Sequence, residues 1–478
     1  MIRNASVLDG SGGAAESLDV AIRDGRICAI GASLRLAASR VVEAEGLTLA
    51  PGFIDTHTHD DIELIRRPAM LAKLSQGVTT VITGNCGISA APVSLRNGLP
   101  EPMNLLGGAD DFQYATFADY VEAIGKARPA VNLGALVGHT ALRNNHMERL
   151  DRVATETETA AMRAQLSEAL DGGALGLSTG LAYGSANAAS AGEVLALAQP
   201  LAAAGAIYAT HMRTEADAIQ DAMSEAFEVG RTCGIPVVVS HLKCLGIANW
   251  GRSGEVLETL DAVRTEQPVG WDCYPYAASS TTLSPHQVDA RTEITITWST
   301  PHPEMAGRSL AQIAEAWSLP QPEAARRLQP AGAIYHSMAE PDVRRILAHP
   351  ATMIGSDGLP NEPRPHPRLW GAFARVLGKY SREEKLMPLS AAIHKMTAMP
   401  AQRFGLAERG TIREGCHADL VLFDADKIID TATFADPIQA AKGIEGVWVN
   451  GVLSYTADGA TGERAGRFLP RGRIAWTQ

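Results

Sequence analysis

Short apolar runs that end at or near a polar residue are the dominant pattern of the chain. They are, in order, GFIDTHTH (52–59), VTTVITGNC (78–86), VNLGALVGH (131–139), GALGLST (173–179), AIYATH (206–211), IPVVVSH (235–241), VGWDCYPY (269–276) and TMIGSD (352–357). Continuous runs of β-branched and small apolar residues are typical of strands that are buried on both faces. The pattern therefore predicts eight core strands.

Stretches of helical character separate most of these runs. ATETETAAMRAQLSEALDGG and TEADAIQDAMSEAFEVGRTCG space their apolar residues as amphipathic helices do, and both end at glycine. Eight alternating units over roughly 300 residues predict an α/β fold, a (β/α)8 barrel of the TIM type. Reactive groups in such barrels gather at the C-terminal strand ends. The polar ends of the eight runs should therefore meet at one rim.

The chain between Tyr276 and Thr352 is longer than one helix and its loops require. It contains the strand-like EITITW, the proline-rich TPHPE and the helical AGRSLAQIAEAWS. We therefore expect an inserted subdomain over about residues 283–348, between strands 7 and 8. Long insertions at this face of a barrel usually shape access to the substrate.

Both ends of the chain alternate as β-strands do. SLDVAIRDGRICAIG contains a DG turn, and GCHADLVLFDA and GVWVNGVLSY show the same alternation. Neither end is large enough to fold stably alone. We expect residues 1–51 and 405–478 to form one small β-sandwich domain, and residues 52–404 to form the barrel.

Composition narrows the classes of partner. The hydrophobic content of 46% and charged content of 20% are ordinary for a soluble globular protein. The net charge of -11 disfavours nucleic acid and anionic membranes, so a small-molecule partner is expected. No export signal or membrane-spanning run is visible, and the six scattered cysteines predict a reducing cytoplasm. The oligomeric state stays open.

Histidines and one cysteine end several predicted strands. His57 and His59 stand two apart on a strand, so their imidazoles share a face and can share a metal. Cys86, His211 and His241 end the second, fifth and sixth strands, and a thiolate with two imidazoles is a favourable zinc set. Each residue alone could instead be a buried structural residue, and Cys86 could be a nucleophile. The shared position at strand ends favours metal binding.

Asp357 closes the eighth run. A carboxylate there can bind metal, accept a proton from water and pass it to a leaving group. An aspartate before glycine also suits a helix N-cap, and the two roles are compatible.

Taken together, these residues resemble the N-acyl-D-amino-acid deacylases (D-aminoacylases) of the amidohydrolase superfamily. The resemblance rests on APGFIDTHTHDD, VITGNCG, GHTALR, GLSTGLAYG, ATHMRTE, VSHLK, YPYAASST, ITWSTPHPE, GSDGLPNEPRPHPRLWGAFARVLG and REGCHADLVLFD, which span nearly the whole chain. HTH and GSDG indicate only the superfamily, whereas NCG, SHLK and PHPR indicate this group.

The resemblance implies a zinc-dependent hydrolase of N-acyl-D-amino acids and a division of the metal ligands. Cys86, His211 and His241 match residues that hold a tightly bound zinc, whereas His57, His59 and Asp357 match a second site that is weaker or partly filled. Zinc would polarise the acyl carbonyl, and Asp357 would move a proton from water to the leaving amine. The fourth run, GALGLST, has no lysine or glutamate, which departs from the carboxylated-lysine pattern of hydantoinases and dihydroorotases.

Substrates of this family carry a free carboxylate, so fixed cations are expected in the pocket. Lys243, Tyr276 and Arg368 match family positions for carboxylate binding, and Arg368 is best suited to a bidentate contact. His139, at the end of the third run, could donate to the substrate or make a structural hydrogen bond. Ser280, with its neighbour Ser279, is a weaker candidate at the same mouth.

Side-chain specificity should depend on SSTTLSPHQVDAR, the start of the insertion. Relatives that prefer acidic side chains are expected to have an arginine near Gln287, where this chain has His286 and Gln287. We therefore expect neutral or hydrophobic N-acyl-D-amino acids, whereas the nearby Arg291 leaves N-acyl-D-glutamate or N-acyl-D-aspartate open. A hydantoinase-like cyclic amidase and a non-catalytic binding protein are further alternatives. The preference for D-amino acids comes from the resemblance alone.

Overall fold

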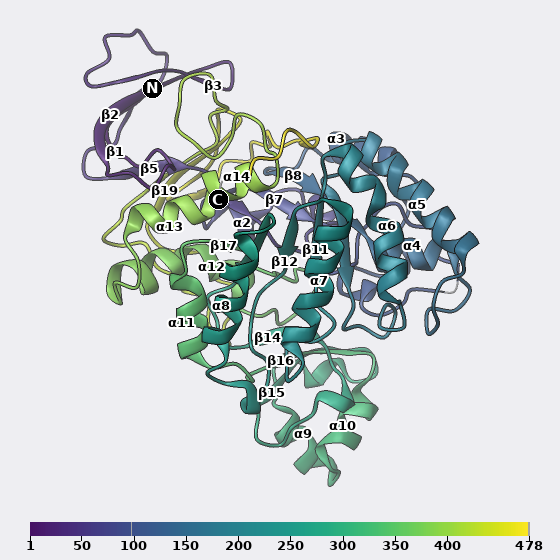
Figure 1. The fold of residues 1–478 in the computed structure, drawn as a ribbon. Helices are drawn as coiled ribbons and strands as arrows, with labels where there is room; N and C mark the ends of the chain where they lie inside the picture. The colour runs from purple at the N-terminus through teal and green to yellow at the C-terminus, as the bar shows by residue number, and fades with distance from the viewer. Residues whose placement is uncertain (97, 477–478) are drawn as a thin grey trace.

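Nine short parallel strands form the centre of this computed structural model, which describes residues 1–96 and 98–476 (Figure 1). One sheet contains β6 (Phe53–Asp55), β7 (Val78–Thr83) and β8 (Asn132–Ala135). The other has the order β17 (Thr352–Ile354), β13 (Val269–Cys273), β12 (Val237–Val239), β11 (Ile207–His211), β10 (Gly176–Gly180) and β9 (Val137–Gly138). Each of the eight predicted runs contains a strand, and the predicted α/β class is confirmed.

The two parallel sheets adjoin at two seams. Only Leu136 separates β8 from β9, and its N–H donates to the carbonyl of Thr83 at 3.0 Å. At the other seam Thr58 forms an isolated parallel bridge with Gly358, just beyond β6 and β17. Both of these strands have three residues, so little regular pairing is available there.

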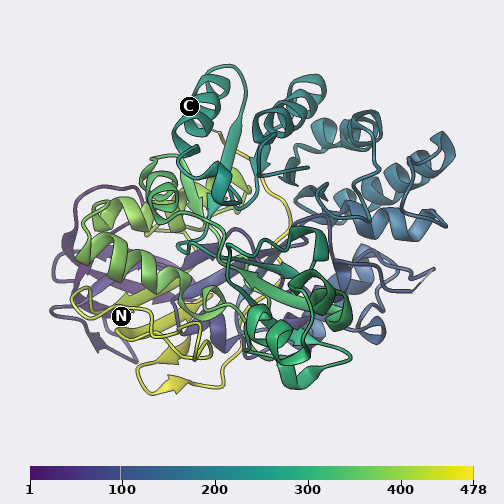
Figure 2. The ribbon, with the colours of Figure 1, turned by 90° about the horizontal axis from the view of Figure 1, so that it is seen from below.

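Helices follow most of the parallel strands and lie outside them (Figures 1 and 2). They are α1 (Glu63–Arg66), α2 (Leu71–Leu74), α3 (Phe117–Ala127), α4 (His139–His146), α5 (Glu156–Asp171), α6 (Ala191–Ala204), α7 (Ile219–Cys233), α8 (Ser253–Arg264), α11 (Glu340–Ala348), α12 (Arg368–Arg375), α13 (Leu389–Met396) and α14 (Ala398–Arg403). The helix expected in ATETETAAMRAQLSEALDGG is α5, which begins at a capping box of Thr155 and Glu158. The helix expected in TEADAIQDAMSEAFEVGRTCG is α7, which ends at the left-handed Gly234.

A separate antiparallel sheet lies in the segment before β17, at the lower end of Figure 1. Its order is β14 (Ser279–Thr282), β16 (Ala331–Tyr335) and β15 (Ile294–Ser299), and α9 (Leu310–Trp317) and α10 (Gln321–Leu328) pack on it. Ile296, Leu310 and Leu328 belong to its own hydrophobic cluster. This segment therefore begins four residues before the predicted boundary of 283.

The two ends of the chain share one nine-stranded sheet. Its order is β21 (Gly459–Ala460), β20 (Val452–Thr456), β19 (Ile444–Val449), β18 (Leu420–Phe423), β5 (Thr48–Pro51), β1 (Ile2–Val7), β2 (Glu16–Arg23) and β3 (Arg26–Gly31), and β4 (Val42–Glu43) also pairs with β1. The antiparallel pair of β5 and β18 joins the two ends. Beyond this sheet, Leu469 donates to the carbonyl of Leu133 at 2.7 Å, so the last described segment lies along β8.

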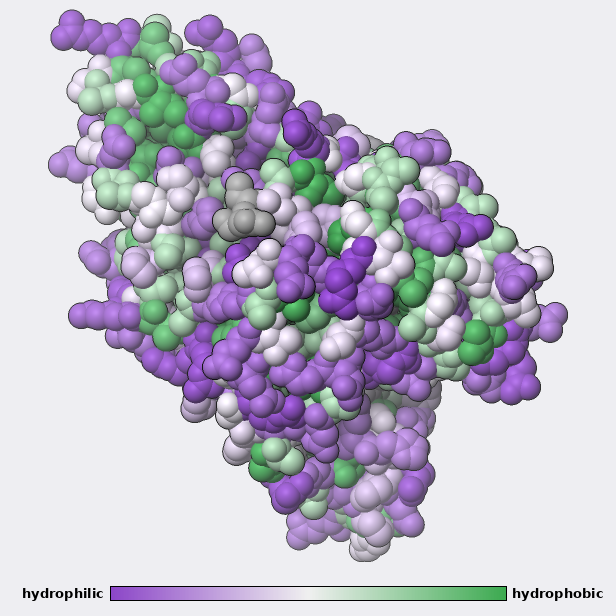
Figure 3. Space-filling model, in the orientation of Figure 1, coloured by the Kyte–Doolittle hydropathy of each residue, from purple (hydrophilic) through white to green (hydrophobic). Residues whose placement is uncertain are grey.

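Hydrophilic residues predominate on the face drawn in Figure 3, with a group of hydrophobic residues over the terminal strands at the upper left. Within the described ranges, no helix has the length and apolar character needed to cross a membrane.

Replacing Gly84 by alanine should destabilise the turn that follows β7. Gly84 has φ +73°, and an added Cβ would lie 2.0 Å from the carbonyl oxygen of Leu136. We expect the free energy of unfolding to fall by about 2 kcal/mol or more, measured by urea denaturation. The matched control is Gly125→Ala in α3, where an added Cβ meets nothing within 4 Å and stability should be unchanged or higher. Equal stability of the two variants would contradict this account.

Candidate metal centre

Five strand ends bring the predicted ligands into one space. The residues are His57 and His59 after β6, Cys86 after β7, His211 at the end of β11, His241 after β12 and Asp357 after β17. Two overlapping groups have all their ligand atoms within 4.8 Å of one another, namely His57, His59, Cys86 and Asp357, and Cys86, His211 and His241. Cys86 is the residue common to both.

The spacing of the donor atoms suits zinc. The Sγ of Cys86 lies 3.2 Å from Nε2 of His57 and 3.3 Å from Nε2 of His241, which lies 3.0 Å from Nδ1 of His211. Zinc–nitrogen and zinc–sulfur bonds in a tetrahedral site place neighbouring donors about 3.3 to 3.6 Å apart. One thiolate and two imidazoles at these separations therefore fit a zinc ion and leave a coordination position open.

The backbone is strained at three of these residues. Cys86, His241 and Asp357 have φ values of 53°, 37° and 49°, in the left-handed region that non-glycine residues seldom adopt. Such conformations persist only where the surrounding structure enforces them, and they cluster at functional sites. Here each directs a side chain from the end of a strand into the shared space.

Two carboxylates that the sequence analysis missed orient the imidazoles from behind. Glu215 Oε1 lies 3.0 Å from Nδ1 of His241, and Asp272 Oδ1 lies 3.4 Å from Nδ1 of His57. Carboxylates in this position fix the orientation of metal-binding histidines and raise their basicity. The sequence pattern gave little indication of either residue, because neither ends a predicted strand: Glu215 lies in the loop after β11 and Asp272 lies within β13.

Charge compensation holds the two anionic ligand candidates in their metal-binding forms. Burial alone would raise the pKa of the Cys86 thiol, but His57 and His241 lower that pKa well below its usual value. Burial would also raise the pKa of Asp357, but Arg368, whose Nη1 lies 2.9 Å from Oδ2 of Asp357, lowers it well below its usual range. Thiolate and carboxylate are the forms that bind metal.

The ligand groups open into a cavity of about 400 Å³. Its lining includes His59, His211, His241, Asp357 and the predicted substrate contacts Lys243, Ser279, Ser280 and Gln287. Tyr183, Arg213 and Asp289 also line it and were not predicted. The cavity therefore combines four of the six candidate ligands with polar and charged side chains.

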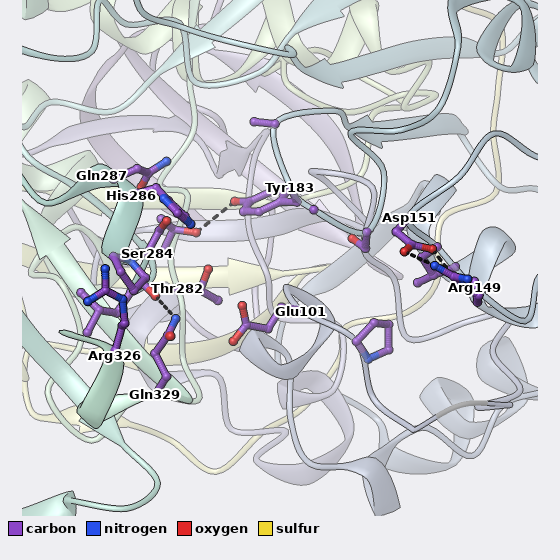
Figure 4. A pocket seen from close by; sticks show the side chains of 18 residues that line it. Glu101, Arg149, Asp151, Tyr183, Thr282, Ser284, His286, Gln287, Arg326 and Gln329 are labelled. Carbon is purple, nitrogen blue, oxygen red and sulfur yellow. Dashed lines mark hydrogen bonds and ion pairs between the residues drawn. The ribbon is translucent and has the colours of Figure 1, made fainter. Parts of the chain in front are cut away.

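A larger outer chamber of about 820 Å³ adjoins this cavity (Figure 4). The two share Ala182, Tyr183, Thr281 and Gln287, and a 3.1 Å hydrogen bond joins the hydroxyls of Tyr183 and Thr281. His286 lines the outer chamber. The hydrogen-bonded pair of Tyr183 and Thr281 therefore lies where the two cavities adjoin.

A protein-family model described as the amidohydrolase family matches residues 40–455. The chain belongs to the amidohydrolase family. Among its relatives, an N-acyl-D-aspartate deacylase of Alcaligenes xylosoxydans xylosoxydans is 49% identical over 100% of this chain and 96% of that protein. A D-aminoacylase and an N-acyl-D-glutamate deacylase of the same organism are each 47% identical over 98% of this chain and over 97% and 96% of their own lengths.

Solved structures agree with these sequence relatives. A D-aminoacylase whose binuclear metal centre is described by one-metal activation and second-metal attenuation has a TM-score of 0.96 at 46% identity, over 98% of this chain and 99% of that chain. An N-acyl-D-glutamate deacylase from Bordetella bronchiseptica, complexed with zinc and a phosphonate mimic of the tetrahedral intermediate, has a TM-score of 0.95 at 45% identity, over 98% of both chains. The resemblance to the D-aminoacylase group is thereby confirmed.

Three predicted substrate contacts of this amidohydrolase, Arg368, Tyr276 and His139, lie outside the cavity lining, and the last two pack elsewhere in the fold. β13 ends at Cys273, so Tyr276 lies beyond the strand and its side chain does not follow the alternation of strand residues. The ring of Tyr276 lies 5.1 Å from that of His366. His139 begins α4 instead of extending a strand, and its Nε2 lies 2.9 Å from Oε1 of the buried Glu193. Both side chains are buried against other elements of the fold.

The remaining candidates are already engaged with neighbouring residues. Lys243 Nζ lies 2.5 Å from Oε1 of Glu215, and Arg368 donates through Nη2 to the carbonyl of Ser280 at 3.0 Å. Arg291 is exposed and pairs with Asp289 at 2.7 Å. Lys243 thus faces the cavity, whereas Arg291 contacts a residue of its wall.

Replacing Glu193 by glutamine should destabilise the amidohydrolase in a pH-dependent way. Burial alone would raise the pKa of Glu193, but the hydrogen bond with His139 and the pairing with Arg143 lower it to about 2. Its carboxylate therefore stabilises the fold above its unfolded pKa of about 4.5, and this contribution is lost as the pH falls towards 2. We expect a loss of about 3 kcal/mol at pH 7 that shrinks by pH 3, measured by urea denaturation. Unchanged stability with a large loss of turnover would instead assign His139 to catalysis.

Proposed function

We propose that this amidohydrolase cleaves the amide bond of N-acyl-D-amino acids and releases a carboxylate and a free D-amino acid. One observation carries the proposal: the ligand atoms of Cys86, His211 and His241 lie within 4.8 Å of one another, and His211, His241 and Asp357 line a single cavity. The deacylases named above, at 45–49% identity over nearly the full chain, support the same activity.

The chain's donors divide into two metal positions. Cys86, His211 and His241 hold the tightly bound zinc, and His57, His59 and Asp357, together with the shared thiolate, form a second and weaker position. When bound, zinc supplies Lewis acidity that polarises a carbonyl and lowers the pKa of a water molecule towards about 7. The similar D-aminoacylase with one-metal activation and second-metal attenuation supports this division.

Asp357 is the proton carrier in this proposal. Arg368 and His59, at 2.9 and 3.2 Å from its oxygens, keep the carboxylate ionised between turnovers. It accepts a proton from the attacking water and gives it to the nitrogen of the departing amino acid. His57 and His59 orient the carboxylate from β6.

The substrate carboxylate is held opposite these groups. Lys243 lines the cavity, and Glu215 fixes its position at 2.5 Å. Ser280 Oγ is buried without a hydrogen-bond partner among the described residues, which leaves it free to donate to a ligand. The Nε of Arg368 also has no hydrogen-bond partner among the described residues. This guanidinium can therefore contact the substrate carboxylate as well as Asp357. We assign Tyr276 and His139 supporting roles.

The cavity wall favours neutral or hydrophobic side chains on the substrate. Gln287 and Asp289 line the cavity, and Arg291 is directed to Asp289. A carboxylate in the substrate side chain would therefore lie near the negative charge of Asp289 and the uncharged amide of Gln287, which is unfavourable. The 49% identity to an N-acyl-D-aspartate deacylase keeps acidic substrates as the second candidate.

The architecture that supports this site is a closed (β/α)8 barrel over residues 52–404. The bridge of Thr58 and Gly358 and the continuity of β8 and β9 support closure at the two seams. The nine-stranded terminal sheet supports a small β domain of residues 1–51 and 405–478, and the sheet of β14, β15 and β16 with α9 and α10 supports an inserted subdomain over residues 279–335.

The activity is tested by hydrolysis of matched N-acetyl-D- and N-acetyl-L-amino acid panels, with zinc content measured in parallel. We expect turnover of the D series only, with at least one zinc per chain. Asp357→Asn should lower kcat by about a thousandfold or more while zinc remains at the Cys86 position, because the carboxylate moves the proton.

Two controls separate the alternatives. Cys86→Ala should lose the tight zinc and the activity together, whereas Cys244→Ala, a second buried cysteine outside the ligand groups, should lose neither. Hydantoin hydrolysis without deacylation would establish the cyclic amidase instead. Zinc binding without any hydrolysis would favour a binding protein.

Introducing a cation at the cavity wall should change the specificity. Gln287→Arg should raise kcat/KM for N-acetyl-D-glutamate relative to N-acetyl-D-leucine by about ten- to a hundredfold, because a fixed guanidinium pairs with the side-chain carboxylate. Steady-state kinetics on both substrates measure the change. Efficient wild-type hydrolysis of N-acetyl-D-glutamate that Arg291→Ala abolishes would establish the acidic specificity instead.

A further inference from the structure

A buried lysine lies beneath the seam between β6 and β17. Lys73, in α2, is 0% exposed. Its Nζ lies 2.8 Å from Oδ2 of Asp55, 3.1 Å from Oδ2 of Asp60 and 3.0 Å from Oγ of Ser356. It therefore joins one polar group on the Ser356 side of the seam to two carboxylates on the other side.

Each of its partners is close in sequence to a candidate ligand. Asp55 precedes His57 by two residues, Asp60 follows His59 directly, and Ser356 precedes Asp357. The backbone N–H of Ser356 also donates to Oδ1 of Asp55 at 2.8 Å, and its hydroxyl donates to Oδ2 at 2.5 Å. The positions of the HxH segment and of Asp357 are thus tied to one charged cluster.

Backbone pairing across the seam is sparse, and the isolated bridge of Thr58 and Gly358 is its only strand-like pairing among the described residues. Only scattered backbone bonds cross it, such as the N–H of Asp357 to the carbonyl of His57 at 2.7 Å. Without Lys73, Asp55 and Asp60 would be buried carboxylates with no compensating cation among the described residues, which is strongly unfavourable. Loss of the ammonium should therefore move the segments that carry them.

A different lysine supports the other ligand group. Lys243 contacts Glu215, which contacts His241, and this network shares no residue with the cluster around Lys73. Cys86, His211 and His241 thus have their own charged support. The charged supports of the two candidate metal positions are therefore separate, although the positions share Cys86 as a ligand.

We propose that Lys73 is a positioning residue that fixes His57, His59 and Asp357 relative to one another and thereby sets the second metal position. It touches neither substrate nor metal and acts through Asp55, Asp60 and Ser356. The inference rests on the proposed function for its effect on turnover, but its effect on metal binding is measured without substrate.

The test compares Lys73→Met with Lys395→Met by zinc titration of the full-length protein, followed by kinetics. Lys395 is also buried, but its Nζ donates to the carbonyl of Leu347 at 2.6 Å and pairs with no carboxylate among the described residues. In Lys73→Met we expect one tightly bound zinc to remain and the second zinc to bind about ten- to a hundredfold more weakly. Because Asp357 is displaced, kcat should also fall about ten- to a hundredfold, with KM nearly unchanged. Lys395→Met should lower thermal stability only.

Two milder variants keep the proposal testable if Lys73→Met does not fold. Ser356→Ala removes the contact between Lys73 and the Asp357 side, and should weaken the second zinc without affecting the first. Lys73→Arg keeps the charge and should retain most of the second-site affinity.

Equal weakening of both zinc ions, or unchanged binding of the second zinc in Lys73→Met and Ser356→Ala, would overturn the proposal. The same shift in Lys395→Met would do so too. If the wild type hydrolyses no N-acyl-D-amino acid, the proposed function fails, but the zinc titrations still decide the role of Lys73.

Discussion

Compensation of two buried anions is the constraint on which this structure depends. The thiolate of Cys86 and the carboxylate of Asp357 lie at the ends of different strands, with little access to water. Uncompensated charges at such depth are strongly unfavourable, so cationic or hydrogen-bonding partners must surround them. His57 and His241 serve the thiolate, and Arg368 serves the carboxylate. Cys86 and Asp357 would both be compensated by a divalent cation held in the ligand group to which they belong, so the geometry and the chemistry point to the same site.

The parallel-strand fold meets this constraint because it brings candidate ligand residues that are far apart in sequence together at the strand ends. Cys86 and His241 are 155 residues apart, yet their side chains lie 3.3 Å from each other. The cost appears as left-handed backbone at Cys86, His241 and Asp357. A rigid scaffold can enforce such strain and gains a preorganised site in return.

The clustering of the candidate metal ligands could be predicted from sequence because each ends or follows a continuous apolar run, which fixes both the strand and its end. The same reasoning failed to bring Tyr276 and His139 to the cavity, since β13 stops at Cys273 and His139 turns into α4. Glu215, Asp272 and Lys73 had no periodic signal. Their importance comes from contacts between segments distant in sequence, which apolar spacing does not encode.

Substrate selection depends on fewer residues than the fold does. The chain is 47–49% identical to three deacylases named for different substrates, so overall identity cannot separate these specificities. One well-placed charged contact is enough to do so. Two cations line the cavity among the described residues, Arg213 and Lys243, and each already pairs with a glutamate, at 2.7 and 2.5 Å. In the proposed mode of binding Lys243 already holds the substrate carboxylate, so an acidic side chain would have to draw Arg213 away from Glu225 or stay unpaired, whereas a neutral side chain meets neither cost.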